Sequence, residues 1–184
     1  MSILTLVASA VLLLGAADPA ADSRTVRTKE GVTLRVETAV TGLEVPWSIA
    51  FTSATRMLVT ERPGRVRVVE NGVLRSVPLA VISDVESRGE TGLMGLTLAP
   101  DYEKSRFLYV SYGYAAPGGI RVRVVRFHDD GTGLSQRKVI LEGLPAARFH
   151  AGCRLRFGPD GKLYVTTGDA TTREIGRASC RERV

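Results

Sequence analysis

Two histidines occur in the chain, and one of them stands in a context that suits catalysis. His150 follows Phe149 and precedes the small pair Ala151-Gly152, which leaves room for a ligand to approach the ring. Imidazole groups ordinarily titrate near neutral pH, so they can accept a proton from a substrate hydroxyl. The context therefore predicts that His150 is a general base. His128, at the end of a predicted strand, is expected to be structural.

Glu90 is the second candidate, because it stands in a loop rich in glycine. Glycines at 89, 92 and 95 let the backbone pass close to a ligand. A carboxylate in that loop could hydrogen-bond a hydroxyl or a cofactor, although the same spacing suits a solvated turn residue. Asp169, after Thr-Thr-Gly, is predicted to cap a turn rather than to catalyse.

Other chemistries lack their usual motifs. The sequence contains no nucleophile elbow, P-loop, dinucleotide fingerprint or zinc-ligand spacing, so hydrolase and nucleotide-binding functions lose support, and no metal ligands are predicted. Cys153 and Cys180 could pair in an exported protein. We instead expect Cys153 to be a small buried residue.

The positive charge does not point to nucleic acid. The net charge is +6, but the arginines alternate with valines, as in 65–68 and 121–124. On a strand this alternation places them on one face, which we expect to be solvated. The sequence has no block of consecutive Lys and Arg residues of the kind that binds along a phosphate backbone, so no nucleic-acid partner is expected.

The segment that carries His150 is predicted to be a β-hairpin. Strands at 154–157 and 163–165 flank a Gly-Pro-Asp-Gly turn. Its apolar-Val-Thr/Ser core recurs at 58–60, 109–111 and 164–166, each time after an apolar residue and a turn. A repeat of about 50 residues, with room for roughly four strands, is the period of a β-propeller blade.

The rest of the chain supports an all-β fold of about three blades. Apolar residues make up 44% of the 184 residues, enough for a packed core. Asn71-Gly72 predicts a type I′ hairpin, Ala99–Tyr102 a turn, and no amphipathic helix is expected. An unclosed β-sandwich is the alternative. Further strands are predicted near 33–36, 38–40, 47–51, 65–70, 93–98, 107–112, 120–127 and 139–141.

Several of these motifs together resemble the glucose/sorbosone dehydrogenase family. The stretches that carry the resemblance, over about 37–170, are 46–51, 58–66, 89–96 with 99–102, and 150–169. These are soluble, pyrroloquinoline-quinone-dependent (PQQ-dependent) sugar dehydrogenases, including the aldose sugar dehydrogenases. The resemblance implies a six-bladed propeller with the quinone over the central channel, polarised by calcium.

The resemblance also implies roles for three residues. His150 takes the place of the general base beside the quinone, which removes the proton of the anomeric hydroxyl while hydride passes to a carbonyl carbon of the quinone. Glu90 takes the place of a group that contacts cofactor and substrate. Phe149 stands at a substrate-contacting position where some members have aspartate, and Cys153 stands where the family often has glycine. The family's quinone clamp and calcium ligands would lie downstream, so we expect the 184-residue chain to be inactive by itself.

The domain organisation is predicted from composition. Residues 1–17 resemble a signal peptide, 18–30 a flexible leader, and 31–173 the partial propeller. Residues 174–184 show no strand pattern and resemble a translated sequencing adapter, so we expect a non-native tail on an N-terminal fragment. The expected location is periplasmic or secreted, without stable membrane insertion after signal cleavage.

The expected partners are an aldose sugar and an external electron acceptor. Two alternatives stay open: a non-catalytic propeller that serves as a binding or scaffold module, and a lactonase-like propeller hydrolase. A lactonase would need several metal-ligating side chains converging on the channel, and these are scarce. A scaffold gives no reason for His150 and Glu90 to stand in glycine-flanked loops.

Overall fold

The computed structural model describes residues 23–171 and 179–180. The chain divides into two compact units, residues 1–39 and 40–184. In the first, β1 (Ser23–Arg27) pairs antiparallel with β2 (Thr33–Glu37). The expected flexible leader was therefore wrong for 23–27, because the turn around Gly31, whose φ is +84°, lets this short segment pair with the next one. The predicted signal peptide lies outside the described residues.

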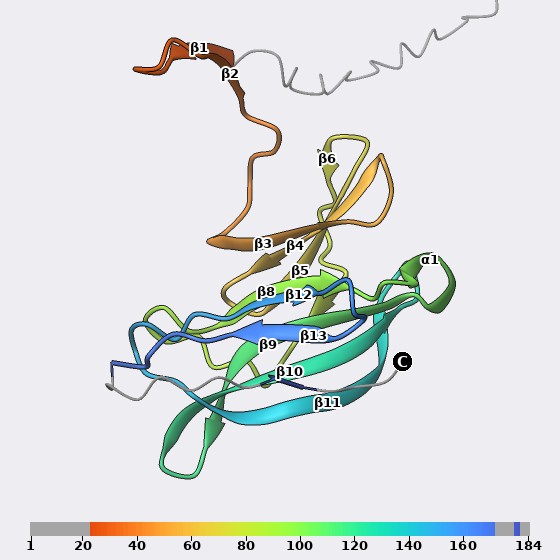
Figure 1. Cartoon of the computed structure of the whole chain (residues 1–184). Coiled ribbons are helices and arrows are strands. Elements are labelled where there is room, and N and C mark those ends of the chain that lie inside the picture. The colour runs from red at the N-terminus through yellow and green to blue at the C-terminus, as the bar shows by residue number, and fades with distance from the viewer. Residues whose placement is uncertain (1–22, 172–178, 181–184) are drawn as a thin grey trace, which may run out of the picture. The chain divides into compact units, whose positions relative to one another are not determined.

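The second unit consists of three antiparallel sheets that follow one another along the chain (Figure 1). The first strands of the three sheets are neighbours, since β3 packs on β8 and β8 packs on β12. The all-β prediction is confirmed. The first sheet contains β3 (Pro46–Phe51), β4 (Arg56–Glu61), β5 (Arg65–Glu70), β6 (Val73–Leu74) and β7 (Ala80–Val81); the second β8 (Leu93–Leu98), β9 (Phe107–Ala116), β10 (Gly119–Asp129) and β11 (Leu134–Pro145); the third β12 (Arg154–Phe157), β13 (Leu163–Thr166) and β14 (Ser179–Cys180).

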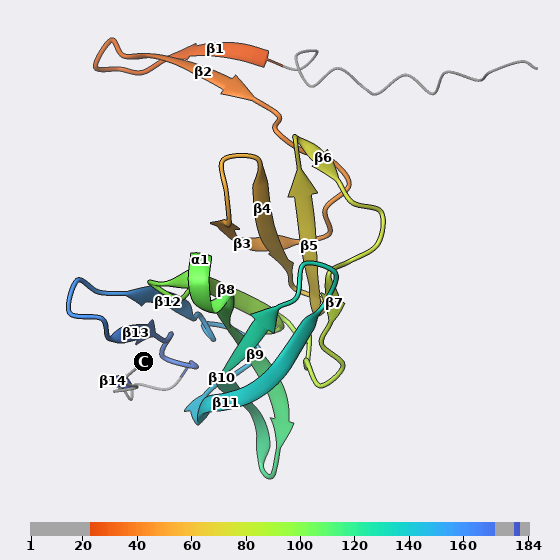
Figure 2. The same cartoon turned by 90° about the vertical axis from the view of Figure 1, so that its right-hand side faces the viewer.

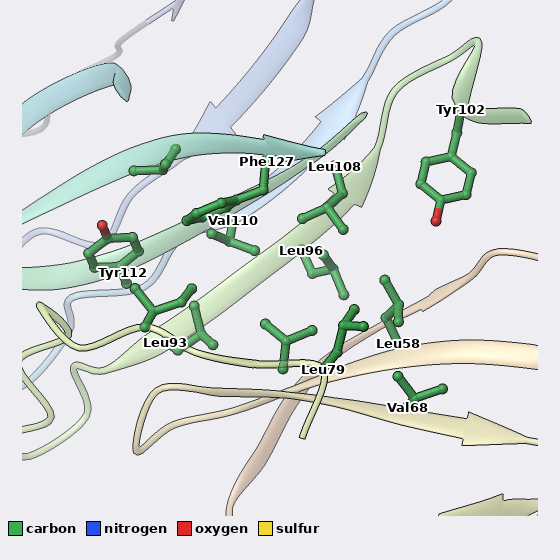
Figure 3. Close-up of a cluster of buried hydrophobic side chains, with 13 residues drawn as sticks. Leu58, Val68, Leu79, Leu93, Leu96, Tyr102, Leu108, Val110, Tyr112 and Phe127 are labelled. Atoms are coloured by element: carbon green, nitrogen blue, oxygen red, sulfur yellow. The ribbon is translucent and has the colours of Figure 1, made fainter. Parts of the chain in front are cut away.

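The strands β8, β9 and β10 of the middle sheet contribute side chains to two separate cores, one shared with the first sheet and one with the third. The strand β11, at the edge of this sheet (Figure 2), is mostly half-buried or exposed. On β9, Leu108 and Val110 belong to the core that also contains Leu58 and Val68 of the first sheet (Figure 3). Tyr109, between them in sequence, joins the core shared with the third sheet. The alternation of β-strand side chains thus builds two cores from one strand.

The recurring Thr/Ser of the predicted repeat links successive sheets. Thr60 Oγ1 accepts a hydrogen bond from the Ser48 amide of its own sheet (3.1 Å) and donates to the Met94 carbonyl of the next (2.7 Å). Ser111 Oγ likewise accepts from the Gly95 amide (2.9 Å) and donates to the Cys153 carbonyl (3.3 Å). The hydroxyl recurs because only a short side chain with both a donor and an acceptor can serve both sheets.

The turn predicted at 99–102 is confirmed, since the Tyr102 amide donates to the Ala99 carbonyl at 3.0 Å. The single-turn helix α1 (Tyr102–Ser105) follows it and ends at Arg106 in the left-handed region. One local prediction was wrong. Arg67, expected on a solvated face, is buried (9% exposed) because Glu61 on the adjacent strand is fully buried and pairs with it at 3.2 Å.

The predicted tail departs from expectation at one point. Ser179 and Cys180 form β14, which pairs with β13, although no strand was predicted there. The other residues of 174–184 lie outside the described part of the chain. Over the described residues, no helix is long and apolar enough to span a membrane.

The Asn71-Gly72 prediction is confirmed. Both residues have positive φ, +52° and +78°, and they connect β5 to β6 as a type I′ hairpin requires.

Candidate active site

His150 lies in the loop between β11 and β12, at the entry to the third sheet. Its side chain is 62% exposed, so a ligand can reach the ring. Its backbone has φ of +56°, in the left-handed region that non-glycine residues rarely adopt. Because that conformation is intrinsically unfavourable, neighbouring groups must hold it.

Asp169 holds the imidazole ring. His150 Nδ1 and Asp169 Oδ1 are 3.0 Å apart, and the same oxygen accepts the Thr171 amide at 2.9 Å. The Thr171 hydrogen bond first, and the His150 contact second, lower the pKa of the Asp169 carboxyl. The segment after β13 also holds the backbone, since the Ala170 amide donates to the His150 carbonyl at 3.1 Å.

The contact fixes which ring nitrogen is available for chemistry. An ionised carboxylate only accepts hydrogen bonds, so Nδ1 must carry the proton that points at Asp169. In the neutral imidazole Nε2 then has a free lone pair and can accept a proton. Asp169 is thus both the turn cap that the sequence predicted and an orienting partner that the sequence did not reveal.

Glu90 meets the His150 loop from the loop before β8. Its Oε2 accepts the His150 amide at 2.6 Å, and its own amide donates to the Arg148 carbonyl at 2.8 Å. The structure thus brings together Glu90 and His150, which lie 60 residues apart in the sequence. The cofactor and substrate contacts foreseen for Glu90 stay predictions.

Phe149, the other predicted substrate contact, is 47% exposed, and the Arg148 guanidinium lies 5.4 Å from its ring centroid. An exposed aromatic ring beside the candidate base is compatible with a ligand-contacting role, which stays a prediction.

Cys153 is a small buried residue, as expected. It is a free thiol, 4% exposed, and burial raises its pKa to about 11 despite a hydrogen bond with Ser111 that acts in the opposite direction. Its backbone φ of +144° favours glycine, which agrees with the glycine that the resemblance places there.

His128 stands apart from this site, on β10. Its Nδ1 lies 2.6 Å from Asp130 Oδ1, and its ring meets Phe107 edge-on. These contacts suit the structural role that was predicted. Across 23–171 and 179–180, no group of three or more His, Cys, Asp or Glu side chains could hold a metal ion.

The family model of glucose / sorbosone dehydrogenases matches residues 43–182. The chain belongs to this family. Among curated relatives, the aldose sugar dehydrogenase YliI of Escherichia coli (strain K12) is 32% identical over 147 residues, which cover 77% of this chain and 40% of the relative. The Hedgehog-interacting protein of Mus musculus is 30% identical over 155 residues, covering 74% of this chain and 22% of that protein.

Two solved structures have the same fold. A putative oxidoreductase (glucose dehydrogenase) from Thermus thermophilus superposes with a TM-score of 0.67 at 40% identity, over 83% of this chain and 42% of that one. The PQQ-bound aldose sugar dehydrogenase of Streptomyces coelicolor also gives 0.67, at 29% identity, over 84% and 44%. The chain therefore spans less than half of these relatives, and its three sheets form part of the predicted propeller.

Proposed function

We propose that this chain is the base-bearing part of a PQQ-dependent dehydrogenase that oxidises aldose sugars at the anomeric carbon to lactones. One observation carries the proposal: an exposed imidazole whose Nδ1 is held by Asp169 at 3.0 Å, which leaves Nε2 to accept a proton. Membership of the sugar dehydrogenase family and the PQQ-bound Streptomyces coelicolor relative support this choice of reaction.

His150 moves the proton in this reaction. Its Nε2 accepts the proton of the anomeric hydroxyl as the electrons of that O–H bond form the C1=O bond. Asp169 stabilises the imidazolium that results, because its carboxylate faces the protonated Nδ1. The contact between Asp169 and Nδ1 holds the His150 ring in place before the sugar arrives, so the base does not need to reorient during the reaction.

The described residues fit the proton-transfer half of such a site. An exposed imidazole whose Nδ1 contacts Asp169 leaves Nε2 as the atom that could accept a proton from an alcohol. When bound, PQQ supplies the two-electron acceptor that takes the hydride from C1. We further propose that Glu90 and Phe149 contact the sugar or the cofactor.

Calcium and the electron acceptor are further parts of the proposal. Because the described residues hold no cluster of three or more metal-ligating side chains, we assign the calcium ligands to the rest of the protein. An external acceptor reoxidises the cofactor. We also propose a periplasmic or secreted location, on the basis of the apolar stretch with small residues at 1–17.

His150→Ala in the full-length protein tests the base. Turnover of an aldose, followed by dye reduction with added PQQ and calcium, should fall by roughly 10²–10⁴-fold, because a positioned base contributes that much. His128→Ala is the matched control, since that imidazole contacts Asp130 and Phe107 outside the site, and it should keep normal turnover. Normal turnover in His150→Ala would contradict the assignment.

A second candidate is a binding module without catalysis. The similarity to Hedgehog-interacting protein, a relative whose name describes a protein interaction, favours keeping this alternative. It is distinguished by the same experiment: a binding module shows no sugar-dependent dye reduction in the wild type. The lactonase alternative gains no support from the described residues, which offer no metal-binding cluster.

A further inference from the structure

The loop that carries Glu90 is fixed at both ends by Arg62, the residue that follows β4 in the first sheet. Arg62 Nη1 donates to the Gly89 carbonyl at 2.6 Å. The Arg62 carbonyl accepts the Leu93 amide at 2.9 Å. The Arg62 carbonyl comes this close because residue 92 is glycine, and a Cβ there would overlap that carbonyl oxygen. The position of the Gly89–Leu93 loop is thus set by the first sheet.

The same loop then fixes the backbone of His150 in the third sheet. Glu90 makes two hydrogen bonds to this segment: its amide donates to the Arg148 carbonyl at 2.8 Å, and its carboxylate accepts the His150 amide at 2.6 Å. Gly89 permits this approach, since a Cβ on it would overlap the Arg148 carbonyl. The pair of bonds spans residues 148–150, where the chain turns into the left-handed conformation of His150.

These contacts form a continuous chain of hydrogen bonds from the first sheet to the third. We propose that Arg62 and Glu90 are positioning residues for His150: Arg62 fixes the glycine-rich loop, and Glu90, through that loop, fixes the His150 backbone. Asp169 orients the ring from the other side. The inference rests on the proposed role of His150 as the base, and it gives Glu90 a structural task that is independent of any contact with sugar or quinone.

The geometry explains why the task needs these side chains. Arg62 reaches Gly89 with one terminal nitrogen, while its Nε is buried without a hydrogen-bond partner within the described part of the chain. A buried unpaired donor is unfavourable, so the Nε of Arg62 opposes stability while its Nη1 stabilises the loop. Methionine has similar length and no polar group, so Arg62→Met removes the bond to Gly89 without leaving a new buried charge.

Hydrogen exchange measured by NMR on the 184-residue chain tests the chain of bonds directly. Glu90→Ala should speed exchange of the His150 amide about tenfold, because the bond of 2.6 Å is lost. Glu90→Gln should restore most of the protection, since an amide oxygen still accepts. Arg62→Met should raise exchange at Glu90 and His150, the two amides that join the Glu90 loop to residues 148–150, while Leu93 stays protected because the main-chain carbonyl of residue 62 remains.

Matched controls separate this effect from general loosening. Glu103→Ala, on the exposed face of α1, and Arg121→Met, at an exposed position of β10, should leave the His150 amide unchanged. The Val110 amide, in the core strand β9, serves as the internal reference in every variant. Unchanged exchange at His150 in Glu90→Ala, with Val110 also unchanged, would overturn the proposal.

Turnover of the full-length protein gives the functional readout. Glu90→Ala should lower kcat about 10- to 100-fold, because a misplaced base slows the chemical step, whereas a change in KM would report the separate contact proposed between Glu90 and the sugar. Glu90→Gln should recover kcat; a loss in Glu90→Gln as large as in Glu90→Ala would show that the charge is needed for another purpose and would contradict the positioning role. If His150→Ala keeps normal turnover while Glu90→Ala still exposes the His150 amide, the bond network stands and the proposed function fails.

Discussion

Gly168→Ala is the perturbation that should disturb the candidate site most selectively. Gly168 lies between β13 and Asp169, against the backbone of His150. A Cβ at this position would overlap the His150 carbonyl oxygen and would stand 2.6 Å from its carbonyl carbon, where real Cβ atoms stay at least 3.0 Å away. The carbon must therefore retreat by at least 0.4 Å (3.0 minus 2.6), and the oxygen by more. Both atoms are backbone, so no flexible side chain can absorb the shift.

The displacement would change the position of the His150 ring relative to Asp169, which the proposed role of His150 as a base requires. Moving the His150 carbonyl strains its bond from the Ala170 amide, and the ring moves relative to Asp169. Because a misplacement of about 1 Å costs on the order of 10²-fold in rate, we expect kcat to fall between about 10- and 100-fold. Gly168 and His150 lie outside both cores, but the displaced carbonyl belongs to the peptide that leads into the buried Ala151, so some loss of global stability should accompany the loss of kcat.

Two measurements check this prediction. Dye-linked sugar oxidation by the full-length protein gives kcat, and the NMR resonances of the His150 ring in the 184-residue chain report the Asp169 contact. Gly133→Ala is the control, because a Cβ there meets nothing within 4 Å and its φ is ordinary. A Gly168→Ala protein with normal kcat and unshifted His150 resonances would refute the reasoning.

Two further predictions concern the scaffold. Asp129 is buried; burial raises its pKa, but hydrogen bonds from Arg56 (2.8 Å, another sheet) and Tyr102 outweigh this, so its pKa lies below the usual value. The ionised form therefore contributes stability that is full above about pH 4 and is lost as pH falls through the depressed pKa. Asp129→Asn should cost about 3 kcal/mol at pH 7, measured by denaturant unfolding, with a smaller gap below pH 3; equal stability at pH 7 would contradict the ion pair. Cys153, with its pKa raised to about 11, should resist alkylation at pH 8 in the native chain and react after unfolding; rapid native labelling would show that the thiol is not enclosed.

The sequence was most informative where the alternation of apolar residues in a strand is followed by residues typical of a tight turn. The apolar-Val-Thr/Ser repeat and the Asn71-Gly72 pair identify the hairpins without tertiary information, because side-chain alternation and positive φ are local properties. Arg67 shows the limit of that logic. Alternation places it correctly on one face, but whether the face meets water or a buried Glu61 depends on a neighbouring strand.

The site divides in the same way. His150 and Glu90 were predicted as site residues from the sequence because an isolated histidine among small residues and a carboxylate among glycines are unusual local contexts. Their hydrogen bond across 60 residues, the orientation of the ring by Asp169, and the anchoring of the Glu90 loop by Arg62 come only from the packing of three successive sheets. The sequence by itself indicated which residues could do chemistry. Only the tertiary structure decided which nitrogen of His150 contacts Asp169 and what holds the ring there, because those contacts join segments that are far apart in the sequence.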